Sequence, residues 1–210
     1  MNIPNPLAVT GISHRLWRRS TSGARTFLNA LLSPKMSPGF FFLDFAVYPL
    51  LITGFLFIAL RAGGIADGLL SMAIVISGYV FWTLAEYLVH RYVLHHVPVF
   101  AAVHLAHHHA PRDLIGTPTL LSAAMFMGLG FWPMLELTSL PVASAWMAGL
   151  LAGYLSYVAV HYAVHHFGSG GHGLLKGLKR HHALHHYRDG HHNFGVTTGI
   201  WDRVFATLAA

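Results

Sequence analysis

Four apolar stretches dominate the chain, and each is long enough to cross a bilayer as a helix. They run from about residue 40 to 60, 68 to 89, 117 to 137 and 142 to 164. Because about 20 apolar residues in a helix cover the hydrocarbon core of a membrane, we expect four transmembrane helices. The longer polar segments are the N-terminus, residues 90–116 and the stretch after residue 164. With four spans these three segments share one side of the membrane.

The first 38 residues are polar, basic and interrupted by prolines. No apolar core follows Met1 closely, so we do not expect a secretory signal peptide. Residues 16–32 mix three arginines with Trp17, Phe27 and leucines, a pattern typical of an interfacial helix on an anionic leaflet. A disordered basic tail is the alternative. We therefore divide the chain into a basic tail, residues 1–38, and a membrane-embedded domain, residues 39–210.

Composition and charge support this division and predict an orientation. Hydrophobic residues make up 54% of the chain and charged residues only 10%, whereas soluble domains carry about a quarter charged residues. Of the 13 lysines and arginines, only Arg61 falls on the opposite side from the three polar segments. The positive-inside rule then places both termini in the cytoplasm. The basic residues flank apolar spans and form no stripe of their own, which excludes nucleic acid as the expected partner. Asp44 and Glu136 lie near span ends, where we expect snorkelling or local pairing.

Histidine is the second unusual feature, with 18 residues spread from His14 to His192. All of them fall on the predicted cytoplasmic side. A metal transporter would place ionisable ligands near the bilayer midplane, so transport remains a distant alternative. The chain has no cysteine, which excludes thiolate zinc sites, iron–sulfur clusters and disulfides.

Ten of the histidines form four clusters, HRYVLH, HLAHH, HYAVH and HALHH: His90, His95, His104, His107, His108, His161, His165, His182, His185 and His186. Residues three and four apart share a helix face, so each HxxHH cluster and the pair His161–His165 can converge on one point. His90 and His95 are five apart, about 140° around an α-helix. They therefore either straddle a helix end or serve different metals.

Ten imidazoles exceed the needs of one ion, since a tetrahedral zinc takes four ligands. Two ions of five or six coordinates would absorb all ten, and imidazole suits iron, copper, nickel and zinc alike. No acidic residue lies within the clusters, so the expected counter-ions or orienting groups are Glu86, Asp189 and Asp202. Their alternatives are an ion pair of Glu86 with Arg91 and turn or capping roles for the aspartates. The remaining histidines have no assigned role: His14, His96, His109, His166, His172, His181, His191 and His192.

The order of these clusters, opened by EYLVHRYVLH and closed by HHYRDGHHNFGVTTGIWDRVFAT, resembles the fatty acid hydroxylase / sterol desaturase superfamily of membrane di-iron enzymes. The resemblance covers about Phe81 to Thr207 and is strongest to the fatty acid 2-hydroxylase branch. It implies an all-α membrane bundle of about four helices, with a cytoplasmic helical cap in which the ten histidines hold two iron ions. It also implies that residues 39–210 form a catalytic domain that uses O2 to hydroxylate a lipid acyl chain in lipid metabolism.

The resemblance carries further expectations. A desaturase or a sterol or carotenoid oxidase on the same scaffold is the alternative activity, and zinc could fill the site without supporting turnover. Aromatic residues at the ends of spans two and four are expected to line a substrate slot or simply to pack: Trp82, Tyr87 and Tyr162. Some relatives carry a fused haem domain, for which residues 1–38 are too few, so we expect a separate electron-transfer protein. It would dock on basic residues that otherwise anchor the membrane surface: Arg112, Lys176, Lys179 and Arg180. The compact size favours a bacterial inner membrane.

Overall fold

The computed structural model describes residues 35–62, 68–168 and 173–209, and these residues form helices and loops without a strand. The possible interfacial helix at residues 16–32, together with His14 and His172, lies outside the described residues. The all-α prediction is confirmed for the part of the chain that is described.

Four segments have the length and apolar composition of membrane spans, as predicted: Pro38–Arg61, Gly68–Leu94, Thr119–Leu137 and Leu140–His166. The first comprises α3 (Pro38–Phe42) and α4 (Asp44–Arg61), and the second α5 (Gly68–Leu88) with the π-helix η3 (Val89–Leu94). The third joins α7 (Thr119–Met125), the π-helix η4 (Phe126–Phe131) and α8 (Trp132–Leu137), and the fourth is α9 (Leu140–His166).

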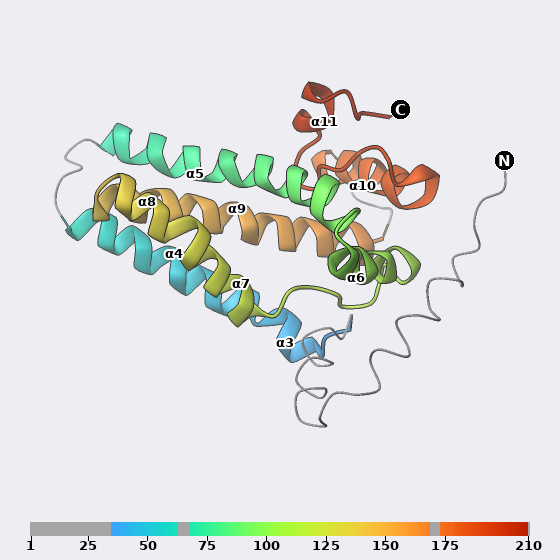
Figure 1. Ribbon diagram of the computed structural model, residues 1–210, viewed down its shortest axis with the longest axis horizontal. Coiled ribbons are helices and arrows are strands. Elements are labelled where there is room, and N and C mark those ends of the chain that lie inside the picture. The colour runs from blue at the N-terminus through green and yellow to red at the C-terminus, as the bar shows by residue number, and fades with distance from the viewer. Residues whose placement is uncertain (1–34, 63–67, 169–172, 210) are drawn as a thin grey trace. The chain divides into compact units, whose positions relative to one another are not determined.

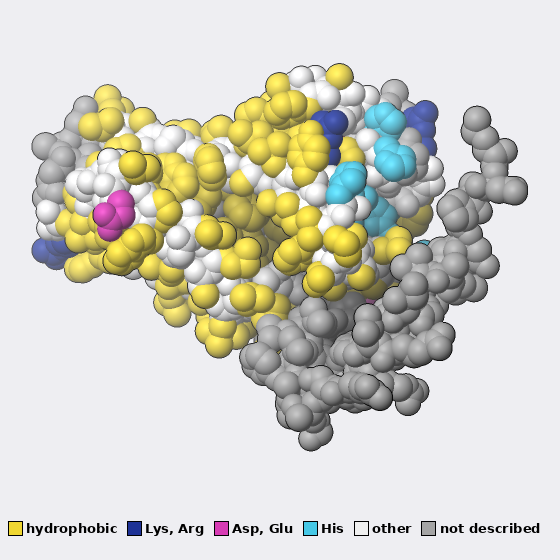
Figure 2. Space-filling model, viewed as in Figure 1, with side chains coloured by type: hydrophobic (Ala, Val, Ile, Leu, Met, Phe, Trp, Pro, Cys, Tyr) yellow, Lys and Arg dark blue, Asp and Glu magenta, His cyan; other side chains and the backbone are white. Residues whose placement is uncertain are grey.

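Helix α9 is the centre of the bundle and packs against both α4 and α5, which run beside it in Figure 1. The helices that follow the second and fourth spans, outside the four spans themselves, gather at the end of the bundle where α5 and α9 finish. We call this end the cap: α6 (Pro98–His109), α10 (Leu174–Leu184), the π-helix η5 (His185–Asp189) and α11 (Ile200–Val204). Figure 2 shows apolar side chains over the flank of the spans and histidines exposed on the cap.

The flanks of the spans expose large apolar side chains, whose exposure to water would be unfavourable. Leu60, Leu120 and Leu137 are each more than three-quarters exposed, at 77%, 80% and 81%. Contiguous apolar surface of this kind marks an interface with lipid or with another protein. Since it surrounds four helices of membrane length, the chain is a multi-pass integral membrane protein.

Glycines allow α5 and α9 to approach closely. A Cβ atom added at Gly149 would lie 1.9 Å from the carbonyl oxygen of Val75, and one at Gly78 would lie 2.1 Å from that of Trp146. Gly149 and Gly153 form a GxxxG pattern, which is typical of close helix contacts in membranes. This contact fixes the position of α5 relative to α9 along the bundle axis. It thereby fixes the relative positions of the histidines at the ends of these two spans.

A buried polar network joins three spans near the cap. Asp44 accepts hydrogen bonds from Thr119 Oγ1 at 2.6 Å and from Tyr154 Oη at 2.8 Å. The hydroxyl groups of Tyr48 and Ser122 lie 2.6 Å apart. The prediction of local pairing is therefore confirmed for Asp44.

Candidate metal centre

The ten predicted histidines form two groups of five at the cap. Group A consists of His90, His95, His104, His108 and His185, and group B of His107, His161, His165, His182 and His186. Within each group, the potential ligand nitrogens all lie within 4.8 Å of one another. No other described residue belongs to either group, so the structure brings together the same ten side chains that the four clusters supplied.

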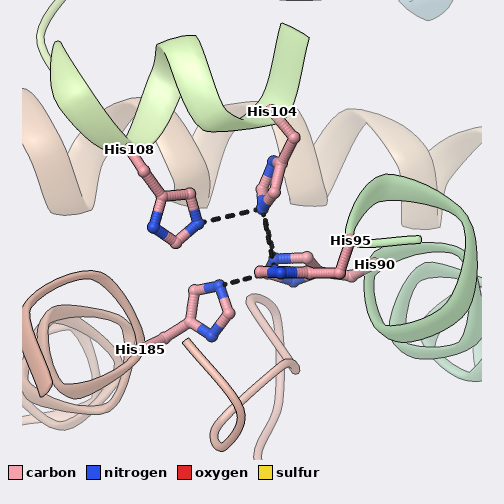
Figure 3. A group of neighbouring side chains, drawn as sticks. All are labelled: His90, His95, His104, His108 and His185. Atoms are coloured by element: carbon pink, nitrogen blue, oxygen red, sulfur yellow. Dashed lines mark hydrogen bonds between the residues drawn. The ribbon is translucent and has the colours of Figure 1, made fainter. Parts of the chain in front are cut away.

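Group A is drawn in Figure 3, where five rings from η3, α6 and η5 point toward a common centre. The Nε2 atom of His104 lies 3.0 Å from that of His90, 3.1 Å from that of His95 and 3.0 Å from that of His108. Two nitrogens bound at right angles, each about 2.1 Å from a metal ion, would lie about 3.0 Å apart. The spacing of group A therefore fits one metal ion.

The π-helix η3 explains how His90 and His95 join the same group. Hydrogen bonds in a π-helix link residues five apart, so residues i and i+5 come close to the same face. His90 lies near the start of η3, and His95 caps its end. Their rings are 5.2 Å apart between centroids. The alternative in which they serve different metals is wrong, because an α-helical angle does not apply here.

The expectation that each HxxHH cluster converges on one point is also wrong. In each cluster the i, i+4 pair shares a group: His104 with His108 in group A, and His182 with His186 in group B. The third histidine, His107 or His185, serves the other group. Adjacent residues point about 100° apart around a helix, so the two neighbouring histidines of each cluster reach different centres. Each of the two HxxHH clusters therefore contributes to both groups.

Group B combines side chains from α6, α9, α10 and η5. His161 and His165, one turn apart on α9, converge as predicted, with 3.3 Å between their Nε2 atoms. The Nε2 atoms of His165 and His182 lie 2.9 Å apart. Both ring nitrogens of His107 and of His186 are buried without a hydrogen-bond partner among the described residues. Because a buried unpaired polar group costs about 1–3 kcal/mol, the unprotonated nitrogen of each ring favours a metal ion as its partner.

Burial and mutual repulsion keep these imidazoles neutral. Burial, reinforced by neighbouring histidines, lowers the pKa of His107 and of His185 to about 3 and that of His95 to about 4. The same causes lower the pKa of His104, His108, His182 and His186. Metal binding needs the unprotonated ring. The ligand atoms of these histidines are therefore in their binding form at neutral pH.

Two of the three predicted acidic residues, Glu86 and Asp202, hold a loop beside group A and make no described hydrogen bond to any of the ten histidines. Glu86 Oε1 accepts from the amides of Val196 and Thr197, at 2.6 Å and 2.9 Å. Asp202 accepts from the amides of Phe194 and Gly195, at 2.8 Å and 2.9 Å. The alternative pairing of Glu86 with Arg91 is not seen, since Arg91 Nη1 donates to Tyr87 Oη at 2.7 Å. The side chain of Asp189 lies outside the described residues.

Several residues in and around this loop were not predicted. His181 contacts Asp202, with 3.0 Å between Nε2 and Oδ2. Although burial acts to raise it, hydrogen bonds from His181, Gly195, Thr207 and Phe194 hold the pKa of Asp202 below its ordinary value. Asn193 is fully buried, and its side chain bonds both the amide and the carbonyl of Ala209. The closing motif NFGVTTGIWDRVFAT contains most of these residues but does not reveal the roles they share.

The three predicted slot residues lie in different surroundings. Tyr87 is fully buried, its hydroxyl 2.9 Å from Thr207 Oγ1 and its ring stacked on Phe205. Trp82 packs against the rings of Phe126, Tyr154 and Tyr157. Tyr162 lines an apolar groove of about 510 Å³, formed with Phe42, Phe45, Phe167 and Leu175 among others.

A second pocket, of about 450 Å³, reaches the two histidine groups themselves. Its wall includes His95, His104 and His108 of group A and His186 of group B. Leu94, Ala101 and Leu105 add an apolar side, and His109, Arg188 and His191 a polar one. Its amphipathic lining suits a molecule with an apolar chain and a polar end.

Comparison with known proteins agrees with this site. The family described as fatty acid hydroxylase matches residues 75–207. Dihydroceramide fatty acyl 2-hydroxylase FAH2 of Arabidopsis thaliana is 36% identical over 146 residues, covering 64% of this chain and 60% of the relative. Fatty acid 2-hydroxylase of Rattus norvegicus is 36% identical over 148 residues, covering 63% of this chain and 38% of the relative.

A solved structure shows the same architecture. Full-length scs7p, in which only the hydroxylase domain is visible, superposes with a TM-score of 0.73 at 26% identity. The match covers 84% of this chain and 68% of the other. The chain thus corresponds to the hydroxylase part of longer proteins, spanning 60% of the plant relative and 38% of the rat one.

Proposed function

The chain belongs to the fatty acid hydroxylase family, and we propose on that basis that it uses O2 to hydroxylate carbon 2 of a fatty acyl chain in lipid metabolism. One observation carries the proposal: two groups of five converging histidines lie where membrane-spanning helices end. The relatives named as fatty acid and dihydroceramide fatty acyl 2-hydroxylases support the choice of substrate.

We propose iron for both groups, with the ten histidines as its ligands. Iron supplies the redox chemistry with O2 that amino-acid side chains lack, whereas zinc does not. The overall reaction takes an acyl C–H bond, O2, two electrons and two protons, and yields the alcohol and water. All ten proposed ligands are imidazoles, and no carboxylate of the described residues belongs to either group.

The position of the site supports hydroxylation close to the head group. His90, His161 and His165 lie in the last turns of the second and fourth spans. An acyl chain anchored in the leaflet presents its carboxyl end at this level, whereas its distal carbons lie near the bilayer midplane. Carbon 2 is next to the carbonyl group, so it can reach the site with little displacement of the lipid. The pocket beside group A has the apolar and polar walls for this part of a lipid.

We also propose that the cap faces the cytoplasm and accepts electrons from a separate acidic protein. The orientation follows from the distribution of basic residues. Arg112, Lys176 and Arg180 are exposed and available for docking. Lys179 instead donates to the carbonyl oxygen of Phe167, which ties α10 to the end of α9.

Mass spectrometry of lipids tests the activity. In a host that lacks 2-hydroxylated lipids, expression of the protein should add one oxygen atom to the acyl chains of its lipids, at carbon 2. His107→Ala and His185→Ala should form no product above background, because each removes a ligand from one group. His96→Ala is the matched control, since His96 is exposed and bonds only the backbone oxygen of Arg91 among described contacts.

Two results would contradict the proposal. Loss of two hydrogens in place of a gained oxygen would identify a desaturase on this scaffold. Equal product from wild type and His185→Ala would show that the histidine groups are not the reaction centre.

A further inference from the structure

The two histidine groups differ in what holds the outer side of their rings. In group A, His90 Nδ1–H donates to the carbonyl oxygen of Phe194, and His185 Nδ1–H donates to that of His192 at 2.8 Å. In group B, the Nδ1 atoms of His107, His182 and His186 are buried and have no hydrogen-bond partner among the described residues. The two groups have the same number of histidines but differ in the hydrogen bonds made by the Nδ1 atoms.

This difference has a chemical consequence. A neutral imidazole carries its proton on one of two nitrogens, and a hydrogen bond from Nδ1–H keeps Nε2 free as the ligand atom. The same bond fixes the orientation of the ring and raises its basicity. His90 and His185 receive both benefits. No hydrogen bond to an Nδ1 atom is described for group B, in which His161 stacks on Tyr157 with 5.5 Å between ring centroids.

The two supporting carbonyls belong to one short segment, residues 192–197, which we call the clamp. Two buried carboxylates, Glu86 and Asp202, hold it by hydrogen bonds. Asp202 binds the amides of Phe194 and Gly195, while Glu86 binds those of Val196 and Thr197. Glu86 also accepts from the hydroxyl of Thr197 at 2.6 Å.

Glu86 and His90 lie one turn apart at the end of the second span. The span thus presents a ligand candidate of group A and, one turn earlier, a carboxylate that bonds Val196 and Thr197 of the clamp, the segment that carries the backbone partner of His90. Glu86 is 4% exposed and Asp202 is fully buried, so solvent cannot replace the amides they hold. Removal of either carboxylate would therefore leave buried amides of the clamp without their acceptor.

We propose that Glu86 and Asp202 are positioning residues for group A alone, acting through the clamp on the tautomer and orientation of His90 and His185. Group A is then the tighter metal position, and group B loads second and loses its ion first. The inference rests on the proposed function only in requiring that both groups bind metal.

Cobalt(II) titration of the purified full chain, followed by absorbance, tests the inference in two backgrounds. His165→Ala leaves group A as the intact position, and His104→Ala leaves group B. Adding Glu86→Gln should weaken cobalt binding about 10–100-fold in the His165→Ala background. In the His104→Ala background the affinity should stay unchanged.

Asp44→Asn is the matched control, because Asp44 is also a buried carboxylate in a span but bonds Thr119 and Tyr154 and not the clamp. It should leave cobalt affinity unchanged in both backgrounds. If Glu86→Gln does not accumulate, Thr197→Ala removes one of the three donors to Glu86 and should show the same selectivity with a smaller effect.

An equal loss of affinity in both backgrounds would overturn the inference, since that result indicates general damage to the fold. No loss in the His165→Ala background would overturn it as well. Absence of cobalt binding by the wild-type chain would count against the proposed function itself, which separates the two failures.

Discussion

At the scale of single residues, the division of the ten histidines follows from the angle between side chains on a helix. The sequence identified all ten, because four histidine clusters, three of them at α-helical spacing, stand out in an apolar chain. It did not predict which ion position each one serves. The π-helical turns η3 and η5 change the angles on which such a prediction depends. A π-helical turn depends on its tertiary surroundings, and the local sequence HRYVLH does not specify these surroundings.

Asn193 provides a prediction at this scale. Its φ of 58° lies in the left-handed region, and its side chain bonds both polar backbone groups of Ala209. Asn193→Ala should lower the unfolding temperature more than Asn193→Gly. Both variants lose the side-chain bonds, but alanine adds about 1–2 kcal/mol of left-handed strain. Thermal unfolding in detergent measures both, and equal unfolding temperatures would show that the backbone conformation at this position costs nothing.

At the scale of secondary structure elements, hydrophobicity predicted the four spans within a few residues. The second span was expected to end near residue 89, yet the helix continues as η3 to Leu94. The segment HRYVL is not apolar enough to be assigned to a membrane span, so the predicted span ended before the helix does. The extension matters because it carries His90 and leads to His95.

The contact of α5 with α9 gives a prediction for elements. Gly149→Ala should lower the unfolding temperature and the metal content, because the added methyl group meets the backbone oxygen of Val75 and forces the helices apart. Gly54→Ala is the matched control: its added Cβ has nothing within 4 Å, and alanine stabilises a helix by about 0.5–1 kcal/mol relative to glycine. Thermal unfolding and metal analysis of both variants provide the measurement. Equal stability of the two variants would exclude a close α5–α9 contact.

At the scale of the whole molecule, the membrane and the chemistry are separated along the bundle axis. The excess of apolar residues and the one-sided histidines predicted this separation. The clamp could not be predicted from the sequence, because the side chain of Glu86 bonds the amide of Val196, 110 positions away in the chain. Nothing in either local sequence specifies that partner. Long-range contacts of this kind are what the structure adds to the list of ligands.

Orientation is a prediction for the whole molecule, and the absence of cysteine makes it simple to test. Single cysteines at Lys176 on the cap and at Ser139, just before α9, should react from opposite sides of the membrane. Both positions are exposed. An impermeant thiol reagent added outside intact cells should label Ser139→Cys and spare Lys176→Cys. The reverse pattern would place the cap outside the cell.

The central claim is that the two histidine groups hold two iron ions. Anomalous X-ray scattering at the iron edge, from crystals of the full chain purified with iron, locates such ions directly. We expect two iron peaks, one within His90, His95, His104, His108 and His185 and one within His107, His161, His165, His182 and His186. A single peak shared between the groups, or iron bound elsewhere with both groups empty, would contradict it.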